Sequence, residues 1–183
     1  MNEESPALYP RLMGASWSAL ARPVARLHAT SAGATGWFRV RRGVGWLARA
    51  LGRMMRLPEA GERVAVELVV ERGGDGEQWV RRFGAHPLPT AQWGRDGLLV
   101  EGMGPVQCWF RLRNEEGALV FEQVRATLGG RRWGVRLPRW VAPQITGRAS
   151  DRQGAVQVVV QIGVPWVGML VAYDGAVTPT ETT

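Results

Sequence analysis

The central part of the chain alternates hydrophobic and polar residues with a period of two. In residues 61–84, one face of the first half is apolar and carries Val64, Val66, Leu68 and Val70. A glycine-rich turn at residues 73–76 follows, and the second half then places Trp79, Arg81 and Phe83 on one face. Period-two alternation broken by such a turn is typical of an antiparallel hairpin with one buried side.

The same alternation continues almost to the C-terminus. Further strands are expected at residues 37–41, 88–94, 97–101, 106–113, 118–128, 131–137, 144–150, 155–163 and 166–173. Prolines interrupt the series at residues 138–143, because proline cannot donate to a central ladder. About eight to ten short antiparallel strands predict a strongly curved sheet or a closed, lipocalin-like β-barrel, which can leave room for one small ligand.

The first thirty residues follow a helical pattern instead, which makes the fold class α+β with helices packed on the sheet. Two short helices are expected, at residues 11–21 and 23–30, because Pro10 and Pro23 each interrupt a continuous helix. His28 lies near the end of the second helix, where an imidazolium would interact favourably with the helix dipole. Residues 31–36 are small and predict a loop. One domain is expected over residues 5–177, with disordered termini at 1–4 and 178–183.

A basic amphipathic helix is predicted at residues 44–56. Its apolar side chains are Trp46, Leu47, Ala50, Leu51, Met54 and Met55, and its candidate interaction residues are Trp46, Arg49, Arg53 and Arg56. Such a helix can lie on anionic lipid. It can also cover one end of the sheet with its arginines in water. The second interpretation is favoured, because Pro58 and Gly61 end the helix tightly against the hairpin.

Composition limits the other classes of function. The chain has 183 residues, a net charge of +7 and a hydrophobic fraction of 45%, which fits one globular domain. All of its basic residues are arginines spread along the sequence, without a zinc-finger, RRM or KH signature, so nucleic acid is not the expected partner. The acidic N-terminus lacks the features of a secretory signal, which predicts a cytoplasmic location. A single cysteine, Cys108, excludes an intramolecular disulfide and is expected in the core.

One arginine departs from the packing pattern. Arg81 lies on an apolar face between Trp79 and Phe83, and a buried guanidinium is costly unless it is paired. Glu101, Glu122 or the carboxylate or phosphate of a ligand could supply the partner, and an internal salt bridge is favoured. The candidate ligand-binding residues are Arg81, Trp79, Phe83, Trp109, Trp133 and Tyr173.

Six segments taken in order carry a resemblance to a known family. They are residues 8–14 (LYPRLMG) with Trp17 and Leu27-His28, 40–43 (VRRG), 57–61 (LPEAG), 79–84 (WVRRFG), 137–143 (LPRWVAP) and 165–175 (PWVGMLVAYDG). Together they resemble a bacterial domain of unknown function, whose members stand alone or are appended to saccharopine-dehydrogenase-like reductases. The resemblance implies a single complete domain and brings no assigned catalytic residue. The chain has no glycine-rich dinucleotide fingerprint, so reductase chemistry itself is not expected.

Catalysis finds little support in the residues. There are two histidines, His28 and His86, and no HExxH, GxSxG or paired-cysteine pattern, so neither a metal nor another cofactor is expected. An enzyme assembled from scattered residues stays open. The favoured function is a non-enzymatic binding module for a small apolar or amphipathic, lipid- or fatty-acid-like ligand, with its carboxylate held by Arg81. The alternative is an interaction domain whose basic helix contacts a reductase partner or the membrane surface.

Overall fold

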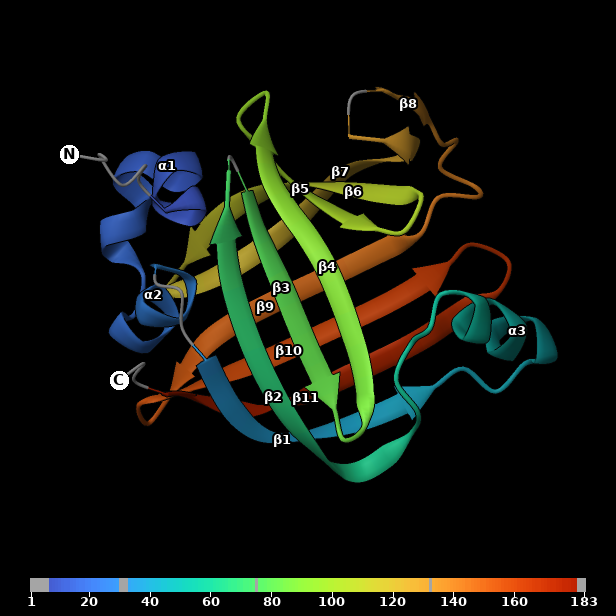
Figure 1. Cartoon of the computed structure of the whole chain (residues 1–183), viewed down its shortest axis with the longest axis horizontal. Coiled ribbons are helices and arrows are strands. Elements are labelled where there is room, and N and C mark those ends of the chain that lie inside the picture. The colour runs from blue at the N-terminus through green and yellow to red at the C-terminus, as the bar shows by residue number, and fades with distance from the viewer. Residues whose placement is uncertain (1–6, 30–32, 75, 132, 181–183) are drawn as a thin grey trace.

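The computed structural model describes residues 7–29, 33–74, 76–131 and 133–180. Its strands are β1 (Gly33–Arg42), β2 (Gly61–Gly73), β3 (Gly76–Phe83), β4 (His86–Arg95), β5 (Leu98–Met103), β6 (Val106–Glu115), β7 (Ala118–Gly130), β8 (Trp133–Arg136), β9 (Gln144–Arg152), β10 (Ala155–Val164) and β11 (Gly168–Thr180). All of these except β8 form one closed antiparallel barrel (Figure 1), because β6 pairs with both β5 and β7 and β1 pairs with β11. Strand β8 pairs only with β7. The barrel form of the predicted fold is confirmed.

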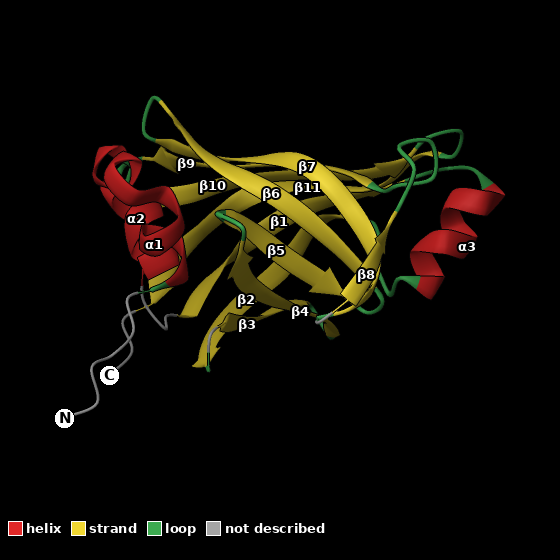
Figure 2. Ribbon diagram, turned by 90° about the horizontal axis from the view of Figure 1, so that it is seen from above, coloured by secondary structure: helices red, strands yellow, loops and turns green. Residues whose placement is uncertain are grey.

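The helices cover the two ends of the barrel. At one end lie α1 (Leu8–Met13), the 3-10 helix η1 (Gly14–Ala19) and α2 (Arg22–Ala29). At the other end lies α3 (Trp46–Met54), as Figure 2 shows. The predicted helix at residues 11–21 is wrong in its bounds. Pro10 falls in the first turn of α1, where an amide hydrogen has no partner within the helix, and the chain tightens into η1 before α2 begins.

The predicted hairpin forms β2 and β3 and sets the inner face of the barrel. Its register pairs Val66 with Phe83, Leu68 with Arg81 and Val70 with Trp79. The apolar members of these pairs are all buried. Because directly paired residues share a face, Arg81 points into the barrel with its apolar neighbours.

Strands β1 and β11 extend by four residues or more beyond their predicted bounds. Residues 33–36, expected in a loop, begin β1, and residues 31–32 lie outside the described part of the chain. At Gly36 a Cβ would stand 2.0 Å from the carbonyl oxygen of Ala176, so this close approach of β1 to β11 requires glycine. Strand β11 runs to Thr180, so the prediction of disorder at 178–180 is wrong, because this stretch pairs with residues 33–35. The predictions for residues 1–4 and 181–183 fall outside the described residues.

Helix α3 packs through only part of the predicted apolar face. Of the predicted residues, Leu51 and Met55 are partly buried against the core, and the buried residues of the helix are Ala48 and Gly52. At Gly52 a Cβ would stand 2.0 Å from the guanidinium of Arg42, so no larger side chain fits there without a shift. Trp46 and Met54, assigned to the apolar face, are 75% and 73% exposed. The predicted burial of the large apolar residues is therefore wrong for these two and for Leu47, which is 40% exposed. No helix in the described ranges combines the length and the apolar character needed to cross a bilayer.

Candidate functional site

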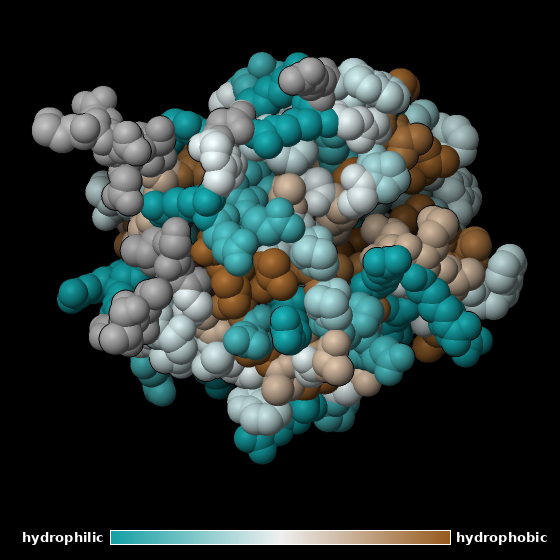
Figure 3. Space-filling view, in the orientation of Figure 1, coloured by the Kyte–Doolittle hydropathy of each residue, from teal (hydrophilic) through white to brown (hydrophobic). Residues whose placement is uncertain are grey.

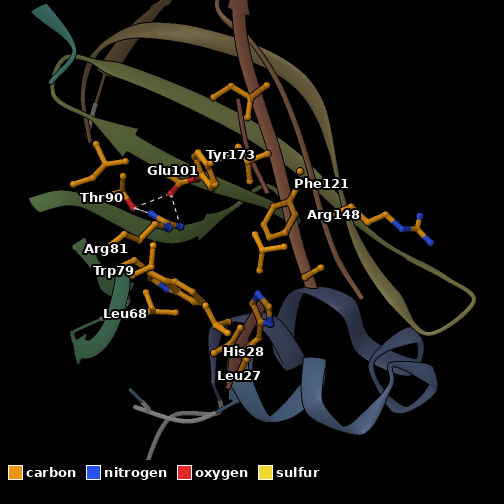
Figure 4. A pocket seen from close by; sticks show the side chains of 18 of the residues that line it. Leu27, His28, Leu68, Trp79, Arg81, Thr90, Glu101, Phe121, Arg148 and Tyr173 are labelled. Carbon is orange, nitrogen blue, oxygen red and sulfur yellow. Dashed lines mark hydrogen bonds and ion pairs between the residues drawn. The ribbon is translucent and has the colours of Figure 1, made fainter. Parts of the chain in front are cut away.

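The barrel encloses a cavity of about 110 Å³ on the side of α1 and α2. Strands from all around the barrel line it, and α2 contributes Leu27 and His28. Most of the wall is apolar. Figure 4 shows a group of polar side chains, Arg81, Thr90 and Glu101, on one side of it, with His28 approaching from the helices. An apolar cavity with a few convergent polar groups is the usual form of a small-molecule site.

The polar group is an internal ion pair with a bridging hydroxyl. Arg81 Nη2 lies 3.2 Å from Glu101 Oε1, and Arg81 Nη1 donates to Thr90 Oγ1 at 2.8 Å. Thr90 Oγ1 in turn donates to Glu101 Oε1 at 2.7 Å. The side chains of Arg81 and Glu101 are only 19% and 14% exposed. Burial alone would lower the pKa of Arg81, but the Glu101 carboxylate, with smaller contributions from Tyr173 and Tyr9, raises it above its ordinary value, so the arginine stays charged.

Three adjacent strands position this group. Arg81, Thr90 and Glu101 lie on β3, β4 and β5, and the pairing of these strands turns each of the three side chains inward. Of the partners that the sequence offers to Arg81, Glu101 is therefore the one in contact. Glu122 pairs instead with Arg113, at 2.5 Å, and is 44% exposed. The salt-bridge alternative is confirmed.

The N-terminal helices are fastened to the barrel by buried polar contacts. The Tyr9 hydroxyl donates to Gln92 Oε1 at 2.7 Å, and both residues are almost completely buried. Glu77, also buried, accepts from the backbone N–H of Leu8 at 3.4 Å and from Trp79 Nε1 at 2.9 Å. Because the first amides of a helix lack partners within the helix, the Glu77 carboxylate satisfies one of them and fixes α1 on the barrel.

His28 presents an unpaired nitrogen to the cavity. Its Nδ1 lies 2.9 Å from the carbonyl oxygen of Val24, and because a carbonyl only accepts, Nδ1 carries the hydrogen. Burial, with a smaller contribution from the charge of Arg81, lowers the pKa of His28 to about 4. The ring is therefore neutral at pH 7, and the predicted imidazolium at the helix dipole is wrong. Its Nε2 is an acceptor without a hydrogen-bond partner among the described residues.

The Tyr173 hydroxyl is a hydrogen-bond donor at the same cavity, where His28 Nε2 is an acceptor. Its side chain lines the cavity, only 6% of the residue is exposed, and its hydroxyl makes no hydrogen bond within the described ranges. Burial raises the pKa of the Tyr173 hydroxyl, so it keeps its proton at neutral pH. Its ring stacks on Phe38 at a centroid distance of 5.7 Å and meets Phe83 edge-on at 5.2 Å. Phe83 thus supports Tyr173 and does not itself line the cavity.

Two of the predicted ligand-binding residues lie elsewhere. Trp109 packs with Trp93 and Val100 in a separate cluster. The Arg125 guanidinium lies over the Trp109 ring, and its Cζ is 3.9 Å from the ring centroid. Phe110, the neighbour of Trp109, lines the cavity instead, because successive residues of β6 face opposite sides of the sheet. Trp133 lies on β8 and is 68% exposed. The structure brings together Arg81, Trp79 and Tyr173, but not these two tryptophans.

Several lining residues had no assigned place in a cavity from the sequence. These are Tyr9, Leu27, His28 and Phe121. The only signal was that three of them belong to the motifs LYPRLMG and Leu27-His28. The described residues hold no group of three His, Cys, Asp or Glu side chains that could bind a metal ion. Cys108 is fully buried, and burial, with a contribution from Glu101, raises the pKa of its thiol to about 12, which confirms it as a core residue.

The comparisons with known proteins identify a family and nothing narrower. Residues 20–177 match the family described as a domain of unknown function (DUF4166). No curated protein and no solved structure matches the chain. The matched region contains α2, α3 and all the strands of the barrel apart from the last residues of β11. Because the match extends over far more than half of its length, the chain belongs to the DUF4166 family of domains of unknown function.

Proposed function

We propose that this domain is a binding module whose barrel holds a small, mostly apolar molecule carrying one uncharged polar group. The observation that carries the proposal is a mostly apolar cavity lined by Tyr173 and His28, whose hydroxyl and Nε2 have no hydrogen-bond partner among the described residues. A ligand that pairs with both atoms gains about 0.5–1.5 kcal/mol for each hydrogen bond and also fills the space between them.

The size of the cavity restricts the ligand. At about 110 Å³ it is somewhat smaller than an engineered protein cavity of roughly 150 Å³ that binds benzene, and far below the roughly 300–1,000 Å³ of sites for drug-sized molecules. A single ring or a short alkyl chain fits these dimensions. A long fatty acyl chain fits only if α1 and α2 move away from the barrel. The lipid-like ligand of the proposal is therefore a short one.

The charge of the site restricts the head group. Glu101 already neutralises Arg81, and Thr90 completes the pairing. A ligand carboxylate beside Arg81 would also stand beside the Glu101 carboxylate, and like charges at short distance repel. A hydroxyl, carbonyl or amide can instead meet Tyr173 and His28 without adding charge. We therefore favour an uncharged head group over a carboxylate held by Arg81.

Three ligands of similar size test these restrictions. We expect p-cresol, with one hydroxyl, to raise the melting temperature at millimolar concentration, toluene to raise it less, and benzoate to leave it unchanged, because a ligand stabilises only the state it binds. Native mass spectrometry of the purified protein, followed by analysis of an organic extract, looks for a natural ligand in parallel. Equal shifts for all three compounds would refute the proposed polarity of the site.

A matched pair of variants locates the binding. Val160 lines the cavity, whereas its neighbour Val159 is 46% exposed on the outer wall of β10. Val160→Phe fills the cavity and should abolish the effect of p-cresol, while Val159→Phe should leave it intact. If p-cresol stabilises both variants equally, it binds outside the barrel. If none of the compounds binds and no small molecule is recovered, the domain is not a module of this kind.

A further inference from the structure

The exposed hydrophobic side chains of the described residues are concentrated at one end of the barrel. We name this region the α3 end and define it as residues 43–60, 128–131, 133–143 and 165–167. Its large exposed hydrophobic residues are Val44, Trp46, Leu47, Met54, Leu128, Trp133, Val135, Trp140, Val141 and Trp166. The large hydrophobic residues exposed elsewhere are Trp37, Val69 and Val159, which lie on the wall of the barrel.

Strand pairing shows that these segments meet at the same end. The turn at 165–167 joins β10 to β11, and β9 begins at Gln144 opposite Gly163, near the end of β10. Helix α3 adjoins the start of β11, where the N–H of Gly43 donates to the carbonyl of Leu170 at 3.1 Å. Figure 1 places α3, β8 and the β10–β11 turn on the same side of the molecule, and Figure 3 shows hydrophobic groups beside hydrophilic ones there.

The way α3 packs explains why its large side chains are exposed. An ordinary amphipathic helix turns its large apolar residues to the core. Helix α3 instead buries only its small residues Ala48 and Gly52, with Leu51 and Met55 partly buried beside them. Trp46 and Met54 point away from the barrel. On the neighbouring turn, Trp166 is 92% exposed. This arrangement leaves bulky apolar tips on several separate segments of the α3 end.

The charge of the α3 end is strongly positive. Its described arginines are all exposed and are Arg49, Arg53, Arg56, Arg131, Arg136 and Arg139. The only acidic residue in the same described segments is Glu59. Basic residues at a membrane surface are attracted to anionic head groups, and each contributes about a fivefold change in affinity.

We propose that the α3 end docks on the surface of an anionic lipid bilayer. Tryptophans at the tips of separate loops are the side chains that anchor proteins at the membrane interface, and the arginines match the charge of the lipid. A fluid layer accepts a tip such as Trp166 without a preformed pocket. The aliphatic tips, including Val44 and Met54, favour lipid over nucleic acid because they offer no ring to stack on bases.

Sedimentation of the full chain with vesicles tests the docking. The vesicles contain phosphatidylcholine alone, or phosphatidylcholine and phosphatidylglycerol at about seven to three, at low and high salt. We expect binding to the anionic vesicles that weakens with salt, since exposed charges are screened. Absence of sedimentation with anionic vesicles would overturn the proposal. Binding to generic duplex DNA that is lost in α3-end variants, without vesicle binding, would assign the surface to nucleic acid and also overturn it.

Paired variants distinguish vesicle binding through the α3 end from a general effect of the protein's positive charge. Arg49→Gln with Arg53→Gln should weaken vesicle binding by about thirtyfold, and Trp46→Ala with Trp166→Ala should weaken it at least tenfold. The controls are Arg82→Gln and Trp37→Ala, which change an exposed arginine and an exposed tryptophan on the barrel wall and should have no effect. If the controls weaken binding as much as the α3-end variants do, the α3 end is not the docking surface.

Discussion

Replacing Arg81 by leucine should destabilise the fold chiefly by leaving Glu101 without its charge partner. Removing one member of a buried ion pair costs about 3–5 kcal/mol, because the other charge stays buried. Both side chains keep some access to solvent, at 19% and 14% exposure, so the lower end of this range applies. We expect Arg81→Leu to lower the free energy of unfolding by about 3 kcal/mol, which at this chain length is a fall of roughly 6–12 °C in melting temperature.

The double variant tests the origin of that loss. With Arg81→Leu and Glu101→Leu together, no charge remains buried, and replacing a whole ion pair by apolar residues is often close to neutral. Thr90 then loses its partners, which leaves a deficit of about 1 kcal/mol. The double variant should therefore be more stable than either single variant. Urea unfolding followed by tryptophan fluorescence measures all three, with the exposed neighbour Arg82→Leu as control. Additive losses in the double variant would refute the reasoning.

Three further predictions concern pH, packing and reactivity. His28 has a pKa of about 4 in the fold and 6.5 as a free side chain, so the unfolded chain binds the proton first and stability is lost as pH falls from 6.5 towards 4. The free energy of unfolding in urea should therefore be about 2 kcal/mol lower at pH 5 than at pH 7 because of this group. His28→Phe should remove that difference. Gly175→Ala would place a Cβ 2.1 Å from the carbonyl oxygen of Trp37, so it should lower the free energy of unfolding by at least about 2 kcal/mol in the same assay, whereas Gly73→Ala, with nothing within 4 Å, should change it little. Cys108, with a thiol pKa of about 12, should not react with a disulfide reagent until the protein is unfolded, and rapid modification of the native protein would contradict its burial.

The barrel was predictable where its strands alternate and its turns are glycine-rich. Residues 61–84 show both signals, and their pairing is as expected. The start of β1 was not predictable, because the stretch from Gly33 to Gly36 has the composition of a loop and becomes a strand only through its close approach to β11. The prediction of which α3 side chains face the barrel was wrong in part for a similar reason. Its hydrophobic pattern does not show that the space beside Gly52 is already filled by the Arg42 side chain.

The candidate site was predictable only on its strands. An arginine on an apolar face indicates a buried ion pair, and Glu101 was among the partners predicted from the sequence. Tyr9 and His28 could not be placed, because they reach the cavity through the docking of separate helices; the hydrogen bond from Tyr9 to Gln92 joins residues 83 positions apart. Trp109 was misplaced although the alternation of β6 points the other way: Cys108 and Phe110 belong to the main core, so Trp109 between them lies on the opposite face and packs with Trp93 and Val100.

Calorimetric titration of p-cresol into the wild-type protein and into Tyr173→Phe tests the central claim most directly. The variant removes one hydroxyl from the cavity and leaves the ring contacts with Phe38 and Phe83 in place. We predict a saturable site in the wild-type protein and about fivefold to tenfold weaker binding in the variant, the value of one hydrogen bond. The stability of the unliganded variant should be unchanged or slightly higher. Equal affinity in the two proteins, or no saturable binding to the wild type, would contradict the account.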